Sequence, residues 1–184
     1  MLCLELGLDL WIDVKVGPAA AADLIVPLVH QYRAHDRVVV CSFNPAVLWH
    51  VRKRDPRIVT AQTRKRYLLS YLNGERSPLY RMLGIPPTIY HAFAPPLDRF
   101  IDWCLHRWSW RLLSISFMLV HHTGVSEDYL DMWRRRGVGV VVWTVNRRAE
   151  KAYYLDYLRC PFMTDDPRAD VDAPDQVFKL PAAF

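Results

Sequence analysis

The sequence predicts an α/β fold in which helices cover a parallel sheet, and two observations support this prediction. Four short apolar runs each end in polar residues, at 10–16, 37–43, 138–146 and 161–167. Helical segments separate them, which is the pattern of β-α-β units. Apolar strands with polar tips are typical of a (β/α) barrel, whose active site is assembled at the carboxyl ends of its strands. We therefore expect the chemistry of this chain at those ends.

The elements follow one another at the spacing of such units. A strand at 10–16 leads into a helix over 18–36, which begins with a tolerated proline and is expected to kink at Pro27. The next strand, 38–43, is followed by Asn44 and Pro45, a typical helix N-cap with proline at the first helical position. Further strands are expected at 57–62, 115–120, 139–146 and 162–164, and further helices at 126–136 and 147–158.

The alternation fails between about 63 and 114, where five prolines indicate an insertion. We therefore expect a partial barrel over 1–170, with this insertion at about 63–114, and an irregular tail over 171–184. Within the insertion, the segment 97–112 is an amphipathic helix whose charged residues argue against a membrane span. Its tryptophans and arginines resemble a helix lying in a membrane interface, although a helix that covers the barrel would have the same apolar stripe. Both interpretations stay open here.

Composition narrows the class of protein. The chain has 184 residues, of which 52% are hydrophobic and 23% charged, so it is one globular domain or part of one. A complete (β/α)₈ barrel usually needs about 250 residues. The formal charge of +5 suits an anionic partner such as phosphate, and nucleic acid is not expected. The four cysteines show no spacing typical of a zinc site or a disulfide framework.

The first strand carries the sharpest functional signal. Strand periodicity places Trp11, Asp13 and Lys15 on one face, so a carboxylate and an ammonium point the same way. One interpretation is a structural ion pair. The other is that Asp13 binds a hard cation while Lys15 binds an anionic group such as a phosphate.

Four ordered motifs carry a family resemblance. WIDVK, VVVCSFNPAVLWHVRKRDPRIVTA, VVVWTVN and FMTDDP together resemble the glycerophosphodiester phosphodiesterase family over residues 3–167. The resemblance implies a TIM barrel of the phospholipase C-like phosphodiesterase kind, which hydrolyses glycerophosphodiesters with a divalent metal, Mg²⁺. Aspartate at residue 13 and the long insertion are most similar to the animal membrane-associated branch, which acts on glycerophosphoinositol and lysophospholipids.

The resemblance assigns roles to matching positions only. It makes Asp13 a metal ligand and Lys15 a residue near the substrate phosphate. Trp143 matches a tryptophan that walls the substrate pocket, and Asn146 matches the polar residue at the tip of that strand, which we expect to bind substrate. The Ser-Phe pair at 42–43 is expected to shape the pocket, and the Thr-Asp pair at 164–165 to brace the rim of the barrel.

Part of the family pattern is unmatched. The family begins with an HRG strand, a strand with a Glu-x-Asp metal pair and a His-Asp dipeptide, and none has a counterpart ahead of WIDVK. The resemblance therefore implies that the first two strands, both catalytic histidines and two metal carboxylates are missing. We accordingly expect an N-terminally truncated chain, inactive by itself, with no catalytic residue. His121 and His122 are the best local substitutes, but exposed histidines at the start of a loop are the favoured interpretation.

Two functions remain as hypotheses. The first is a metal-dependent phosphoric diester hydrolase of lipid metabolism, acting on glycerophosphodiesters or lysophospholipids. The second is a non-catalytic protein that binds phospholipid or a membrane surface through the insertion. The family resemblance also implies a membrane-associated location, either peripheral or through a missing N-terminal segment, and a cytoplasmic one otherwise. An unrelated barrel enzyme with a phosphate site is a weaker third possibility.

Overall fold

The computed structural model describes residues 3, 6–15, 17–72 and 75–167. These residues divide into two compact units. The first contains the described residues of 1–63 and 113–184, and the second contains those of 64–112. The tail expected at 171–184 lies outside the described residues.

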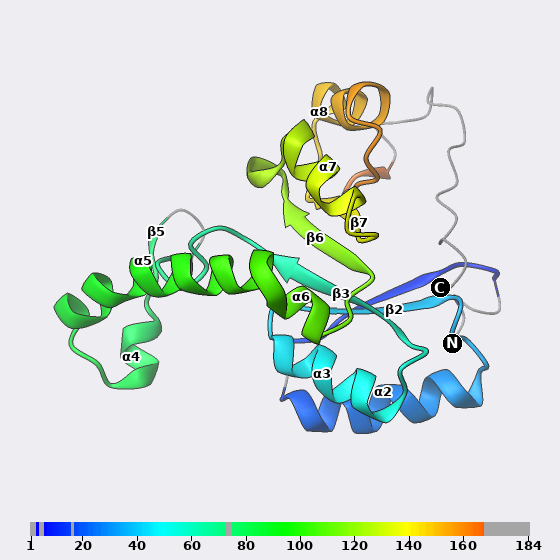
Figure 1. Ribbon diagram of the computed structural model, residues 1–184, viewed down its shortest axis with the longest axis horizontal. Coiled ribbons are helices and arrows are strands. Elements are labelled where there is room, and N and C mark those ends of the chain that lie inside the picture. Colours follow the sequence, from blue (N-terminus) through cyan, green and yellow to red (C-terminus); the bar gives the residue numbers. More distant parts are fainter. Residues whose placement is uncertain (1–2, 4–5, 16, 73–74, 168–184) are drawn as a thin grey trace. The chain divides into compact units, whose positions relative to one another are not determined.

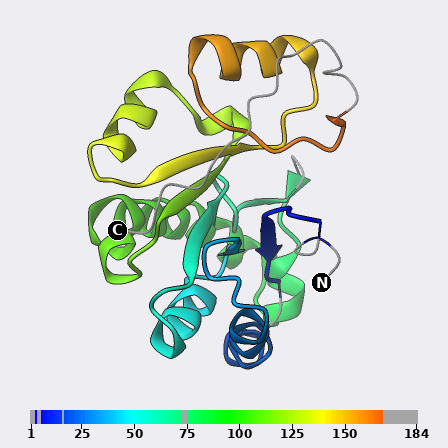
Figure 2. The same cartoon turned by 90° about the vertical axis from the view of Figure 1, so that its right-hand side faces the viewer.

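The first unit is built on a five-stranded sheet with the order β1-β2-β3-β6-β7 (Figures 1 and 2). The strands are β1 (Leu10–Asp13), β2 (Val38–Ser42), β3 (Val59–Arg64), β6 (Phe117–His121) and β7 (Gly139–Trp143). The pairs β1–β2, β2–β3 and β6–β7 are parallel, and the backbone N–H of Ser116 donates to Thr60 O at 2.9 Å beside β3. The expected parallel α/β sheet is confirmed, and it forms part of a (β/α) barrel.

Helices join these strands, as the alternating pattern predicts. They are α2 (Pro18–Gln31), α3 (Pro45–Arg54), the 3₁₀ turn η2 (His122–Gly124), α7 (Glu127–Arg134) and α8 (Arg148–Ala152), which continues as a π-helical turn, η3 (Tyr153–Tyr157). The expected cap of α3 is present, since Asn44 Oδ1 accepts from Ala46 N at 3.0 Å. Helix α2 is shorter than expected, because the chain turns at Tyr32 and passes through a positive φ of 50° at Arg33.

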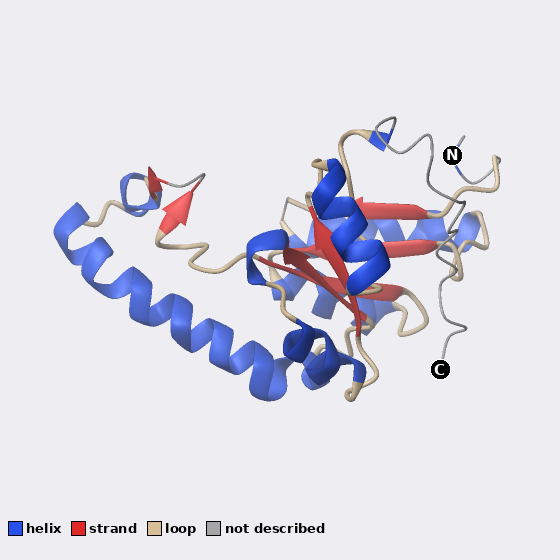
Figure 3. Cartoon of the chain, turned by 90° about the horizontal axis from the view of Figure 1, so that it is seen from above, coloured by secondary structure: helices blue, strands red, loops and turns tan. Residues whose placement is uncertain are grey.

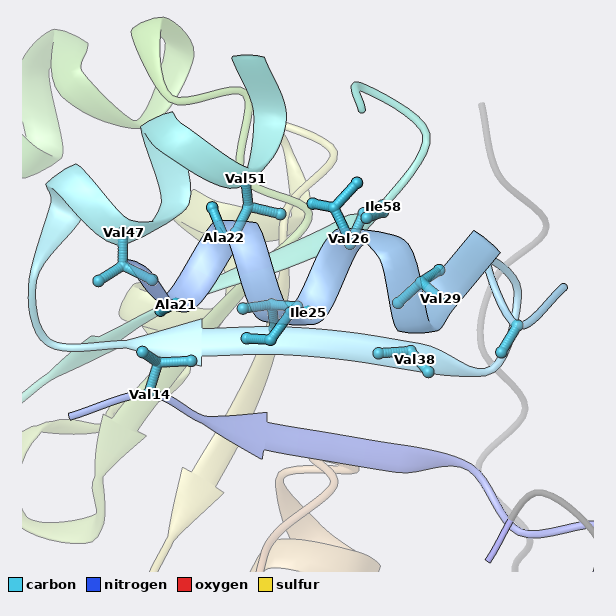
Figure 4. Packing of buried hydrophobic residues seen from close by; sticks show 12 residues of the cluster. Val14, Ala21, Ala22, Ile25, Val26, Val29, Val38, Val47, Val51 and Ile58 are labelled. Carbon is cyan, nitrogen blue, oxygen red and sulfur yellow. The ribbon is translucent and has the colours of Figure 1, made fainter. Parts of the chain in front are cut away.

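Buried side chains pack on both faces of the sheet. On the outer face, α2 and α3 cover β2 and the neighbouring strands with aliphatic residues (Figure 4). On the opposite face, which we call the inner face, a second cluster contains Val39, Cys41, Ala61, Phe117, Leu119 and Val141. Trp11 and Trp143 pack against this second cluster. The alternation along each strand therefore sets which side chains reach the inner face.

Several strands differ from the expectation, and β1 and β7 each end three residues earlier than expected, at Asp13 and Trp143. The third begins at Val59 rather than at Arg57, because the backbone N–H and the guanidinium of Arg57 both donate to the Asp55 carboxylate and hold a turn there. The last expected strand, 162–164, is reduced to a single parallel bridge between Phe162 and Val142. β6 begins two residues later than expected, at Phe117, and runs one residue further, to His121.

Gly139 at the start of β7 is required by a close approach. A Cβ built there would lie 2.5 Å from the Phe117 ring of β6. Only a residue without a side chain allows this packing between the two strands.

The second unit contains the segment in which the alternation fails. It is formed by β4 (Tyr71–Leu72), β5 (Glu75–Arg76), α4 (Leu79–Leu83), α5 (Pro87–Cys104), a π-helical turn η1 (Leu105–Ser109) and α6 (Trp110–Leu112) (Figure 3). Helix α5 begins before the expected helix and runs through Pro95 and Pro96. The Asp98 carboxylate accepts from the backbone N–H groups of Leu69 and Ser70, both at 2.9 Å, and so fixes the preceding segment against α5. Among the described helices, none has the length and apolar character needed to cross a bilayer.

Candidate functional site

The candidate site begins with the two charged residues after Trp11. The Trp11 ring meets the Phe117 ring edge-on at 5.5 Å, so this side of β1 belongs to the inner face. Asp13 follows two residues later and therefore points to the same side. Its Oδ2 lies 3.4 Å from Lys15 Nζ, with 43% of the Asp13 side chain and 75% of the Lys15 side chain exposed. The structure thus brings the two predicted residues together at the carboxyl end of β1.

Cys41 is the buried residue beside the two charged side chains. Cys41 and Asp13 face each other in the register of β1 and β2. Burial, and after it the negative charge of Asp13, raise the pKa of the Cys41 thiol to about 12, while the positive charge of Lys15 acts in the opposite direction. Both charges are therefore close enough to the inner cluster to act on a buried thiol.

An aromatic wall lies at the ends of β2, β6 and β7. The ring of Trp143, at the end of β7, meets the Phe43 ring edge-on at 5.7 Å and the His121 ring at 5.1 Å. The indole Nε1 of Trp143 is buried and has no hydrogen-bond partner among the residues that the structure describes. The wall thus combines apolar ring surface with a buried donor that no described residue satisfies.

His121 belongs to this wall, although a loop histidine was the favoured interpretation. Phe117 and Leu119 face the inner cluster, and His121 continues the same alternation at the end of β6. Its Nδ1 lies 2.9 Å from Thr123 Oγ1. The expected strand ended at residue 120. If it had been extended by one residue, the alternation of Phe117 and Leu119 would have placed His121 on the inner face.

Gln62 holds the end of β2 next to the aromatic wall, and no pattern in the sequence predicts this role. Its amide Nε2 donates to the carbonyl oxygens of Ser42 and Phe43, both at 3.0 Å. The Ser42 hydroxyl in turn donates to Val14 O at 2.7 Å. These bonds tie the end of β2, and with it the Phe43 backbone, to the neighbouring strands. The Ser-Phe pair is therefore placed at the rim where a pocket-shaping role was expected.

Asn146 lies beyond β7, where its side chain is already engaged. Its Oδ1 accepts from Asp165 N at 2.9 Å and from Thr164 Oγ1 at 3.2 Å, and its Nδ2 donates to Asp165 Oδ2 at 3.2 Å. The amide therefore braces the loop after residue 163. Binding of substrate by Asn146 stays a prediction.

The carboxylate of Asp13 is a suitable ligand for a hard dication, but the described residues of this rim do not complete a metal site. Magnesium prefers six ligands, mostly oxygen, in near-octahedral geometry. Within the described part of the chain, a group of three or more closely spaced His, Cys, Asp or Glu ligands occurs at His30, His35 and Asp55, and Asp13 is not in it. Asp13 therefore offers one oxygen donor here, beside the ammonium of Lys15.

Comparison with known proteins gives a consistent family assignment. Residues 16–169 match the model of the glycerophosphoryl diester phosphodiesterase family. Glycerophosphodiester phosphodiesterase 1 of Mus musculus is 32% identical over 169 residues, which is 91% of this chain and 49% of the mouse protein. The Homo sapiens protein of the same name is 32% identical over 172 residues, which is 92% of this chain and 50% of that protein. The chain thus spans about half the length of these relatives.

Solved structures support the same fold. A Silicibacter pomeroyi protein assigned as a glycerophosphoryl diester phosphodiesterase superposes with a TM-score of 0.61 at 20% identity, covering 91% of this chain and 51% of that one. A phosphodiesterase from Oleispira antarctica, solved in complex with its product sn-glycerol-3-phosphate, has a TM-score of 0.53 at 11% identity and covers 88% of this chain and 52% of that one. At these identities the likeness is one of fold.

Proposed function

Because the chain belongs to the glycerophosphoryl diester phosphodiesterase family, we propose that it carries part of the site of a hydrolase that cleaves glycerophosphodiesters. In this reaction a water oxygen attacks phosphorus and the bond to one ester oxygen breaks, which yields an alcohol and glycerol 3-phosphate. The observation that supports this proposal most directly is that two pairs of predicted or candidate residues meet at carboxyl ends of strands. Asp13 lies 3.4 Å from Lys15 at the end of β1, and His121 meets Trp143 at the ends of β6 and β7.

Lys15 is the proposed phosphate-binding residue. Its side chain is 75% exposed, so the ammonium group can approach a ligand phosphate without burying an uncompensated charge. Trp143 would provide the wall against which the glycerol part packs, since its ring lies between Phe43 and His121 at the strand ends. His121 lies against that ring and is the titratable group of the wall that could exchange a proton with the leaving alcohol.

Asp13 is proposed to supply one ligand to a divalent cation, for which Mg²⁺ is our candidate. When bound, such a cation would polarise the phosphoryl oxygens and offset their charge. The carboxylate is half exposed and oxygen-based, which suits a hard ion. We draw no catalytic step from the metal, since one carboxylate does not form a site.

The second candidate function, attachment to a phospholipid surface, rests on the second unit. Large apolar side chains are strongly exposed along α5 to α6, including Phe93 at 68%, Phe100 at 59%, Trp103 at 57% and Leu112 at 67%. The Arg111 guanidinium lies 5.4 Å from the Trp110 ring in the same segment. Aromatic and basic side chains together favour the interface of an anionic bilayer. The same surface would bring a lysophospholipid substrate to the enzyme.

Binding and hydrolysis test the first candidate. We expect sn-glycerol 3-phosphate to shift the indole N–H resonance of Trp143, and the shift to be lost in Lys15→Met. Lys53→Met is the matched control, because Lys53 stacks on the exposed Trp49 ring at 4.9 Å on α3. Release of glycerol 3-phosphate from a glycerophosphodiester is followed in the same samples with and without Mg²⁺. Binding that survives Lys15→Met, with no hydrolysis in any sample, would contradict the proposal.

Vesicle sedimentation tests the second candidate. The chain should sediment with vesicles that contain phosphatidylserine, and Trp103→Ser should release it, because an exposed aromatic ring is removed from the interface. Trp49→Ser is the control, since Trp49 is 42% exposed but lies in the first unit. Equal sedimentation of both variants would exclude α5 as the attachment surface.

A further inference from the structure

Three side chains with metal-ligating atoms converge before the amino ends of β2 and β3, whereas Asp13 lies at the carboxyl end of β1. His30 comes from the last turn of α2, His35 from the turn that follows it, and Asp55 from the residue that caps α3. The first two residues precede the amino end of β2, and Asp55 precedes the amino end of β3. Asp13, in contrast, is the last residue of β1. The three residues therefore lie apart from the proposed phosphodiesterase site.

The ligand atoms of this group point at one another. The Nε2 atoms of His30 and His35 lie 2.5 and 2.9 Å from the same oxygen, Oδ2 of Asp55. All three ligand atoms fall within 4.8 Å of one another, and the two imidazole rings are 5.2 Å apart with a tilt of 30°. Two imidazole nitrogens and one carboxylate oxygen form a donor set suited to zinc and its neighbours, and less suited to magnesium or calcium.

We propose that His30, His35 and Asp55 bind a divalent transition-metal ion of the zinc class, with water as a further ligand. The exposed fractions fit this arrangement. The Asp55 side chain is 4% exposed and forms the fixed base, while His30 at 47% and His35 at 25% leave a path for the ion and its water. The ion would join the end of α2 to the end of α3 and have a structural role.

Arg57 both supports and competes with this site. Its backbone N–H and its Nε donate to Asp55 Oδ1 at 2.9 and 3.0 Å, which orients the carboxylate as an outer-shell partner does. Its Nη2 also donates to Oδ2 at 2.8 Å, the oxygen that the ion requires. The Arg57 side chain is 69% exposed, so the guanidinium can leave Oδ2 for solvent while the backbone contact to Oδ1 stays.

Metal titration of the complete chain tests the proposal. After treatment with a chelator, the protein should bind one equivalent of Zn²⁺, and Co²⁺ should give the ligand-field absorption of a site with imidazole ligands. His30→Gln and His35→Gln should each weaken Zn²⁺ binding by at least about tenfold. Loss of an outer-shell partner alone weakens metal binding by about 10–100-fold, and loss of a direct ligand should weaken it at least as much. A hundredfold excess of Zn²⁺ over its Kd should raise the Tm by roughly 5–10 °C in the parent chain and by much less in either variant.

His50→Gln is the matched control. His50 also lies on α3, but its ring contacts Trp49 at 4.9 Å and its Nδ1 lies near Arg54, so its loss should leave Zn²⁺ binding unchanged. Equal affinity in the parent chain and both cluster variants would overturn the proposal, as would Mg²⁺ binding at these residues as tightly as Zn²⁺. Absence of a zinc-dependent rise in Tm would do the same. None of these readouts depends on phosphodiesterase activity, so this proposal and the one above can fail separately.

Discussion

Replacing Gln62 by methionine tests how the aromatic wall is held. The substitution keeps the length of the side chain and removes its amide. The two hydrogens of Nε2 serve the carbonyl oxygens of Ser42 and Phe43 at 3.0 Å and of Thr63 at 3.1 Å. Gln62 is buried, so these carbonyl oxygens would lose a donor that water cannot readily replace.

The expected cost follows from two opposing effects. Two hydrogen bonds contribute about 1–3 kcal/mol together, at about 0.5–1.5 kcal/mol each. Leaving carbonyl oxygens unpaired adds to this cost. Against it, the buried Oε1 of Gln62 has no partner among the described residues, and its removal recovers part of the loss. We expect a net destabilisation of about 1–3 kcal/mol, which is roughly 3–9 °C in Tm for a chain of this size.

Urea unfolding of the parent chain and of Gln62→Met measures the difference in their free energies of unfolding. The midpoint should fall in Gln62→Met with little change in slope, and the Trp143 indole resonance should broaden because the Phe43 backbone loses its anchor. Gln31→Met, at the exposed end of α2, should change the stability by less than about 0.5 kcal/mol. If both variants unfold at the same urea concentration, Gln62 does not hold the end of β2 and the reasoning is wrong.

Three further predictions concern the buried thiols and the close approach at β7. At about pH 8 a thiol reagent should modify the exposed Cys3 in the folded chain but reach Cys41 and Cys160 only after unfolding, because burial raises the pKa of both thiols to about 12. The raised pKa of Cys160 stabilises the folded state fully at a pH below 9.0, the pKa of the thiol in the unfolded chain. This contribution is lost as the pH rises toward about 12. The urea midpoint should therefore fall less at alkaline pH in Cys160→Ala than in the parent chain. Gly139→Ala should cost about 1–3 kcal/mol in thermal melts, because its Cβ would lie 2.5 Å from an aromatic ring, while Gly17→Ala, with nothing within 4 Å, should cost clearly less.

Sequence periodicity was sufficient for the sheet because burial on both faces leaves unbroken apolar runs. Residues 38–42 are buried throughout and form β2 within one residue of the expected bounds. The third strand was misplaced because Arg57 belongs to a turn held by Asp55, a contact that no strand propensity contains. The short run at 162–164 was overestimated, since it has a single bridge, at Phe162, to a neighbouring strand.

The candidate site was partly predictable for a similar reason. Asp13 and Lys15 are two residues apart, so alternation alone places them together. The contact between His121 and Trp143 joins two strands and depends on the register of β6 and β7, which the sequence does not state. The meeting of His30 and Asp55 spans 25 residues and two helices, so only the folded chain reveals it.

The segment 65–116, which separates β3 from β6 along the chain, affects the folding rate. β3 and β6 are neighbours in the sheet, and the backbone N–H of Ser116 donates to Thr60 O between them. This whole segment nevertheless separates the two strands along the chain. The cost of closing such a loop grows only slowly with its length, so the final stability suffers little. The search for that distant pairing is slow, however, because non-local contacts form late. We expect the β1–β3 and β6–β7 halves to form early and their joining to limit refolding, which leaves the apolar inner cluster open to other chains until the two halves meet.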